Sequence, residues 1–153
     1  MINEQYKKRL SKLAGITENN INDKPDPELK TKLLSLGGTS VAPVYEEDLH
    51  DLLSRGQVFS GKKSKVIKMR QSRCHANASE YWDTYSKKHG YDKVKIVTGW
   101  ALSITDDMWR QHTWAYLPGD DLVIETTLKR KLYFGFILTT EEAHTFYMNN
   151  CHW

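Results

Sequence analysis

The segment RQHTWAYLPGDDLVIETTL, residues 110–128, restricts the fold of this chain more than any other part of it. Two runs of alternating side chains surround the tripeptide PGD, and turn residues between two such runs are typical of a β-hairpin. The pattern predicts antiparallel strands at 110–117 and 121–128. The protein is therefore expected to contain a sheet that is at least partly antiparallel.

Hydrophobic periodicity, strand composition and helix-end signals predict the elements around this hairpin. β-branched residues indicate a strand at 93–103, and a further strand is expected at 131–138. Helices are predicted at 3–14, 27–36, 46–56 and 74–87, and a capping box at 139–142 opens a last helix. This order predicts an α+β fold, in which a helix packs on a small, mostly antiparallel sheet of three or four strands.

The length of 153 residues suits one domain, with a helical N-terminal portion at 1–56 and the core at 57–153. Hydrophobic residues make up 39% of the chain and charged residues 27%, the profile of a soluble globular protein. No stretch approaches the ~20 apolar residues of a membrane span, and the N-terminus lacks the apolar core of a secretory signal. Two distant cysteines do not make a disulfide framework, so we expect a cytoplasmic protein with reduced thiols and no membrane partner.

The length of the hairpin loop decides which side chains meet across the two strands. A loop of two or four residues pairs Trp114 with Glu125 and places His112 on the same face of the sheet. His112 and Glu125 are then diagonal neighbours, with backbones about 7–8 Å apart and side chains within reach of a hydrogen bond. A three-residue loop would separate them onto opposite faces. Since a carboxylate beside an imidazole fixes its tautomer and stabilises the imidazolium, the hairpin predicts the base and the orienting acid of a triad.

Cys74 is the nucleophile that this pair lacks. It begins the helix predicted at 74–87, where unpaired N–H groups and the helix dipole favour a thiolate. A stripe along that helix is expected to pack against the sheet and bring the thiol toward His112; it comprises Cys74, Ala78, Tyr81, Trp82 and Tyr85. The alternative interpretation is that Cys74 is a small buried core residue.

Further residues are predicted to contact a substrate. The backbone N–H of Cys74 is one expected donor to an oxyanion, and Gln71 or His75 is expected to supply a second. Trp109 and Trp114 lie near the predicted base in sequence. These two side chains either form the wall of a substrate groove or pack in the core beneath the sheet.

Three segments resemble the transglutaminase-like superfamily. HTWAYLPGDDLVIETT is similar to the family segment in which H-x-W opens one strand and acid-x-Thr follows on the next. SRCHANASEYW resembles the segment that carries the Cys at the head of a helix, and KIVTGWALS is similar to the V-x-G-aromatic strand between the two. The resemblance covers roughly residues 70–128 and implies a papain-like core with a triad of Cys74, His112 and Glu125.

This resemblance implies a cysteine-dependent hydrolase or acyltransferase that acts on amide bonds, of the protease, deamidase or transglutaminase type. A protein or peptide substrate and no cofactor are the matching expectations. Two positions depart from the family pattern. Glu125 stands where Asp is usual, and Ser72 stands two residues before the Cys, where a Gly is usual.

Other functions remain open at this point. Members of the superfamily have lost activity, so the chain is alternatively a binding module that holds a partner with its aromatic groove and its basic segment at 61–73. That segment and the basic run at 128–131 suit phosphates, but no nucleic-acid-binding motif accompanies them. The pairs Cys74-His75 and Cys151-His152 lack zinc-finger spacing, and neighbouring residues on a helix point about 100° apart, so no metal site is predicted.

Overall fold

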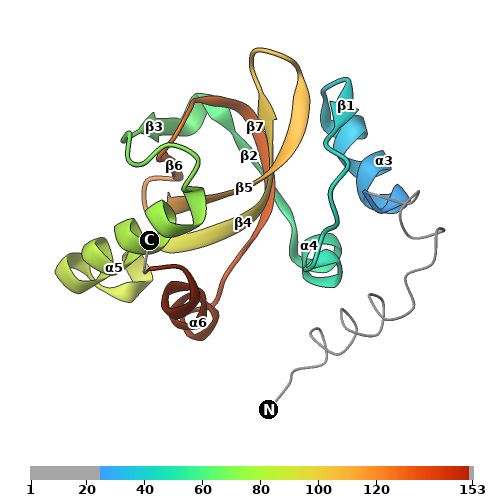
Figure 1. Ribbon diagram of the computed structural model, residues 1–153. Helices are drawn as coiled ribbons and strands as arrows, with labels where there is room; N and C mark the ends of the chain where they lie inside the picture. Colours follow the sequence, from blue (N-terminus) through green and yellow to red (C-terminus); the bar gives the residue numbers. More distant parts are fainter. Residues whose placement is uncertain (1–24, 152–153) are drawn as a thin grey trace.

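The computed structural model describes residues 25–151 and shows a mixed α/β protein with one curled sheet of seven strands (Figure 1). The strands are β1 (Ser40–Val41), β2 (Gln57–Ser60), β3 (Ser64–Val66), β4 (Lys95–Ser103), β5 (Met108–Leu117), β6 (Leu122–Glu125) and β7 (Arg130–Ile137). The helices are α3 (Pro27–Leu36), α4 (Leu49–Arg55), α5 (Cys74–His89) and α6 (Thr140–Asn150), with single 3-10 turns at Gly61–Lys63 and Tyr91–Lys93. Within residues 25–151, none of the helices is long and apolar enough to cross a membrane.

The sheet has the strand order β2-β7-β4-β5-β6-β3, and β1 pairs with one end of β5. Neighbouring strands run antiparallel except for the pairs β1–β5 and β3–β6, so the prediction of a mostly antiparallel sheet is confirmed. The predicted number of strands was too small, because residues 40–41 contribute β1 and residues 57–66 contribute β2 and β3. β1 has only two residues, and β2 and β3 have four and three and are largely exposed, so none of them shows the alternation that identifies a strand in a sequence.

The predicted hairpin is present, and its loop has four residues. β5 and β6 pair Leu117 with Leu122, which leaves residues 118–121 for the turn. β6 ends at Glu125, before the predicted strand end at 128. The chain leaves the sheet here because the backbone N–H of Thr127 donates to the Glu125 carboxylate at 3.0 Å instead of to a neighbouring strand.

The helix-end signals at 26 and 139–142 act as predicted. The Asp26 side chain accepts hydrogen bonds from the N–H groups of Glu28 and Leu29 at the start of α3. Thr139 and Glu142 form a reciprocal capping box at the start of α6.

The central helix also begins where the sequence predicts, at Cys74, and it ends at His89. α4 is shorter than expected and begins at Leu49. The helix predicted at 3–14 lies outside the described residues. Residues 25–56 contain β1 as well as two helices, so a purely helical N-terminal third is not confirmed.

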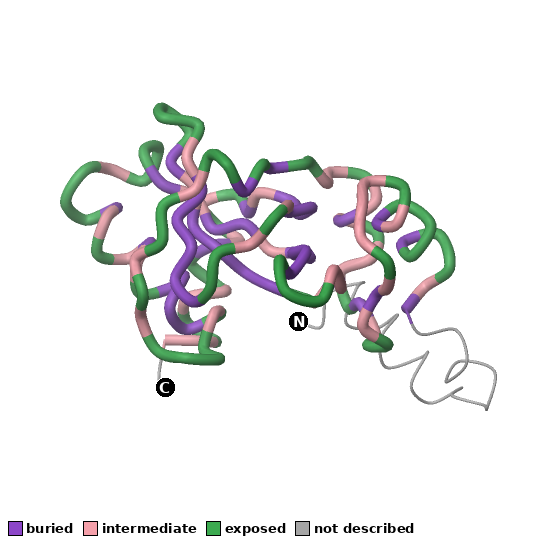
Figure 2. Tube along the Cα trace, turned by 90° about the horizontal axis from the view of Figure 1, so that it is seen from above, coloured by how far each residue is buried: buried purple, intermediate pink, exposed green. Residues whose placement is uncertain are grey.

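Each face of the sheet buries its own set of apolar side chains. The outer face is covered by the helices, and its core includes Leu33 of α3, Leu52 of α4, Trp82 of α5, Ala143 of α6 and Ile96, Trp100 and Leu102 of β4. The inner face carries a smaller cluster of Phe59, Val97, Ala101, Trp114, Val123 and Tyr133. All six lie on strands, so the curl of the sheet itself encloses them (Figure 1). Buried positions accordingly follow the strands through the middle of the molecule, whereas the connecting loops are exposed (Figure 2).

One edge of β5 is only partly paired, and this gap positions the site. β4 runs along the whole of the other edge, but β6 pairs only with residues 115–117 and β1 only with residues 108–109. Between them, residues 110–114 have no strand neighbour on this side among the described residues. α5 packs against β5, and His112 lies in the middle of the gap.

Candidate functional site

His112 and Glu125 form a buried pair across the hairpin. β5 and β6 pair Ala115 with Ile124, and the next pair in this register is Trp114 and Glu125. His112 is then the diagonal neighbour of Glu125, as the four-residue loop requires. Nε2 of His112 lies 2.9 and 3.0 Å from the two oxygens of Glu125. The exposed fractions of these side chains are only 3% and 0%. Since Nε2 is occupied by the carboxylate, Nδ1 is the ring nitrogen that remains for chemistry.

The Glu125 carboxylate is held by more donors than His112 alone. It accepts hydrogen bonds from the N–H and the hydroxyl of Thr127 and, at 2.8 Å, from the hydroxyl of Tyr133. Burial by itself raises the pKa of this carboxyl, but the hydrogen bonds from His112, Thr127 and Tyr133 outweigh it and lower the pKa to about 2. Glu125 is therefore a fixed anion that orients the imidazole.

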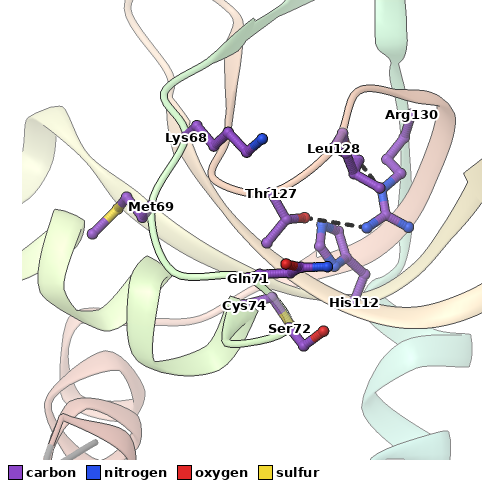
Figure 3. A pocket seen from close by; sticks show the side chains of 9 residues that line it. All are labelled: Lys68, Met69, Gln71, Ser72, Cys74, His112, Thr127, Leu128 and Arg130. Carbon is purple, nitrogen blue, oxygen red and sulfur yellow. Dashed lines mark hydrogen bonds between the residues drawn. The ribbon is translucent and has the colours of Figure 1, made fainter.

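Cys74 lies at the first turn of α5, half-buried and beside His112 (Figure 3). Burial raises the pKa of the thiol, but contacts with His112 and His75 dominate and lower the pKa to about 5. Burial by itself lowers the pKa of His112. Its contacts with Cys74 and Glu125 outweigh burial, so the pKa of His112 lies above its usual value. Both shifts favour the pair of a Cys74 thiolate and a His112 imidazolium.

The approach to α5 keeps the helix N-terminus open. Ser72 has a φ of 57°, in the left-handed region, and turns the chain into the helix. Arg73 is the N-cap residue, and among residues 25–151 the helix has no side-chain cap there. The buried amide of Asn77 donates to the carbonyl oxygen of Arg70 at 2.7 Å and so ties the incoming loop to the first turn. The N–H groups around Cys74 are consequently left to face an anion.

A pocket of about 230 Å³ opens over Cys74 and His112 (Figure 3). Three chain segments form its walls: the stretch after β3, the entry to α5, and the β6–β7 connection. The lining residues are Lys68, Met69, Gln71, Ser72, Cys74, His112, Thr127, Leu128 and Arg130. The backbone N–H of Met69 donates to the Thr126 carbonyl oxygen, so the first wall is fixed against the third.

A second pocket, of about 220 Å³, lies on the other side of His112. It contains three acidic residues, Glu46, Glu47 and Asp48, together with His75 and Gln111. Glu46 is buried and accepts a 2.7 Å hydrogen bond from the indole N–H of Trp100. Burial raises the pKa of this carboxyl. The two pockets therefore differ in the groups that line them, basic in one and carboxylic in the other, and His112 lines both.

The residues predicted to contact a substrate are distributed over three places. Gln71 lines the pocket of Cys74, and His75 lines the second pocket, with Nδ1 at 3.6 Å from the Cys74 sulfur. Trp109 and Trp114 are fully buried and line neither pocket. The indole N–H of Trp109 donates to the Gly37 carbonyl oxygen, and Trp114 belongs to the inner cluster. Both tryptophans thus occupy the core position that was the alternative to a groove wall.

Several side chains that shape the site were not predicted individually. Thr127 is part of the E-x-T pattern, and this pattern could have predicted that Thr127 contacts Glu125. Tyr133 sits within an ordinary apolar strand, and Asn77 within an ordinary helix, so neither has a local signal. Asn77 bonds to Arg70, seven residues away in the chain, and Tyr133 bonds to Glu125, eight residues away. Only the fold brings these partners together.

Comparison with protein families, with curated proteins and with solved structures finds no match for this chain. Among the described residues, no group of three or more His, Cys, Asp or Glu side chains is arranged to hold a metal ion.

Proposed function

We propose that this protein is a cysteine-dependent hydrolase or acyltransferase, in which Cys74, His112 and Glu125 form a triad that acts on an amide bond. The single observation that carries the proposal is the meeting of a low-pKa thiol with a buried imidazole-carboxylate pair at one accessible pocket. A core thiol would have its pKa raised by burial, whereas the thiol of Cys74 has a pKa of about 5.

We also propose a transglutaminase-like core for the fold. A helix headed by the nucleophile is followed in the chain by a strand with the histidine and a strand with the acid, which is the order that the resemblance implies. The proposal for the fold rests on this order and on the three similar segments. A peptide or protein amide is the corresponding substrate class.

The roles follow from the atoms that face each other. The Cys74 thiolate attacks the carbonyl carbon of the amide, and the N–H groups at the open start of α5 stabilise the negative charge on its oxygen. His112 Nδ1 then gives its proton to the amine nitrogen, the C–N bond breaks, and the acyl group stays on sulfur as a thioester. Water or a second amine attacks the thioester while His112 takes up the proton, and Cys74 leaves as thiolate. Hydrolysis and transfer differ only in this acceptor.

The pH dependence of alkylation tests the activated thiol. In a Cys151→Ser background, which removes the other cysteine, the rate of reaction with iodoacetamide is measured from pH 4 to pH 9. We expect the rate to rise with a midpoint near 5, because the thiolate of Cys74 persists down to that pH. His112→Ala should shift the midpoint upward and His75→Ala less so. A midpoint near 9, the ordinary value for a thiol, would overturn the proposal.

Acylation tests the chemistry itself. The folded protein is mixed with p-nitrophenyl acetate, and the release of p-nitrophenolate is followed while mass spectrometry locates the acetyl group. We expect one rapid equivalent of p-nitrophenolate and a thioester on Cys74, both lost in Cys74→Ala and slowed in His112→Ala. The matched control is the same chain in concentrated urea. If Cys74 is acetylated no faster in the folded protein than in urea, the protein is not a cysteine acyl-transfer enzyme, and the fold serves binding instead.

A further inference from the structure

The pocket that contains the thiol is cationic on its substrate side. Its nine lining residues include Lys68 and Arg130 and no aspartate or glutamate. Two pairs of charges around it cancel: the Cys74 thiolate faces the His112 imidazolium, and Arg130 Nε lies 3.9 Å from Glu125 Oε1. The charge that remains is that of Lys68.

Arg130 is held in place as a rigid donor. Its Nε–H donates to the Leu128 carbonyl oxygen at 2.9 Å, and Nη2 donates to the Thr127 hydroxyl at 3.2 Å. Only 14% of this side chain is exposed. Its Nη1 group has no hydrogen-bond partner among residues 25–151 and is left for a ligand.

Lys68 is the exposed member of this pair of cations. It follows β3 on an exposed stretch, and within the described part of the chain it takes part in no ion pair. Figure 3 shows its side chain extending from the β3 side toward the loop of Thr127 and Leu128. Lys68 and Arg130 thus approach the pocket from opposite walls.

The pocket on the far side of His112 is lined by the carboxyl groups of Glu46, Glu47 and Asp48 and by no lysine or arginine. An anionic group is therefore attracted to the side of Lys68. Cys74 lines the pocket of Lys68 and not the other, so the acyl group that becomes bonded to sulfur has to lie on that side. The cations of the thiol side therefore set the direction in which an anionic substrate binds.

We propose that the acyl donor of this protein carries a carboxylate next to the scissile carbonyl, and that Lys68 and Arg130 bind it. This inference deepens the proposed function and rests on it. Lys68 and Arg130 are specificity-determining residues, and Lys68 is the one that can be changed without disturbing the buried triad, since it is exposed.

Two alkylating agents of nearly equal size test the inference, neutral iodoacetamide and anionic iodoacetate. Their rates with Cys74 are measured in the Cys151→Ser background at pH 6 and pH 9, and the ratio of iodoacetate to iodoacetamide is compared between variants. The thiolate-imidazolium pair also attracts iodoacetate, so the ratio of the parent protein alone decides nothing. We expect Lys68→Gln to lower the ratio roughly 3- to 10-fold, the effect of one charge about 5 Å away in a partly solvated site. The loss should shrink in high salt.

Lys129→Gln is the matched control. It removes the same charge from an exposed position two residues after Thr127 that does not line the pocket, so its ratio should equal that of the parent. If Lys68→Gln lowers the ratio no more than Lys129→Gln does, the carboxylate subsite is refuted. The rate with iodoacetamide reports separately on the triad: a slow rate at pH 6 contradicts the proposed function, and the ratio at pH 9 still decides on the subsite, because an ordinary thiol ionises there too.

Discussion

Ser72 adopts the left-handed conformation two residues before the thiol, with a φ of 57°. Glycine adopts this conformation without strain, so the proposed resemblance, in which a glycine usually stands two residues before the Cys, has a physical reason at this turn. In this chain a residue with a Cβ atom accepts the strain, and the turn still delivers Cys74 to the start of α5.

Substitution of Ser72 measures that strain. Ser72→Gly should raise the free energy of unfolding by up to about 1 kcal/mol, because relief of the strain exceeds the added freedom of the unfolded chain. Ser72→Val should lower it by about 1 kcal/mol or more, because β-branched side chains are poorly accommodated at positive φ. Urea unfolding of the two variants provides the comparison. Equal stability of the Gly and Val variants would show that the turn relaxes to another conformation.

At the scale of elements, the first turn of α5 depends on a buried side chain of the same helix. Asn77 is fully buried, and it donates to the carbonyl oxygen of Arg70, which precedes the helix. The loop that carries Gln71 and Ser72 is thereby fixed relative to Cys74. No pattern in the sequence distinguishes this asparagine from a solvent-exposed one, since its partner lies outside the helix.

Asn77→Ala should therefore loosen the loop as well as the fold. We expect a loss of about 0.5–1.5 kcal/mol in the free energy of unfolding, the net contribution of one partly buried hydrogen bond. The iodoacetamide rate of Cys74 at pH 6 should fall in parallel. Glu80→Ala is the control on the same helix: it breaks the exposed Arg70–Glu80 ion pair, worth about 0–1 kcal/mol, and should leave the rate unchanged. An unchanged rate in Asn77→Ala would mean that the loop is held by other contacts.

At the scale of the whole molecule, the buried pair of His112 and Glu125 links folding to pH. The pKa of Glu125 is about 2 in the folded protein against an ordinary 4.5, so its contribution to stability is present above pH 4.5 and is lost as the pH falls toward 2. The difference corresponds to about 3 kcal/mol. His112 is protonated in both states in this window, because its folded pKa lies above its ordinary 6.5.

Urea unfolding of Glu125→Gln and of the parent between pH 7 and pH 2.5 tests this linkage. The variant should be less stable at pH 7, and the gap between the two proteins should narrow as the pH falls. Tyr133→Phe, which removes one donor to the same carboxylate, should show the same trend with a smaller amplitude. Glu141→Gln changes an exposed carboxyl of α6 and serves as the control. A gap that stays constant with pH would mean that Glu125 is not an anion in the folded protein.

The local features of this fold were predictable because they depend on neighbours in the chain. The capping box at Thr139 is decided by hydrogen bonds within a few residues, and the start of α5 was predicted from the helical spacing of its apolar residues. Likewise, once the hairpin loop was known to have four residues, strand periodicity placed His112 and Glu125 on one face. The additional strand β2 was missed because its pairing partner, β7, lies 72 to 78 residues away in the chain.

The order of a thiol at a helix start, a histidine on one strand and an acid on the next is already present in the amino-acid sequence, since backbone periodicity and turn length suffice for that. The positions of Trp109 and Trp114 required the folded structure, because burial depends on what covers a side chain. The folded structure alone showed that Lys68 and Arg130 share a pocket with Cys74, whereas Glu46 lies beyond His112. Charges from segments far apart in the chain act together only after the sheet has curled and brought those segments to one opening.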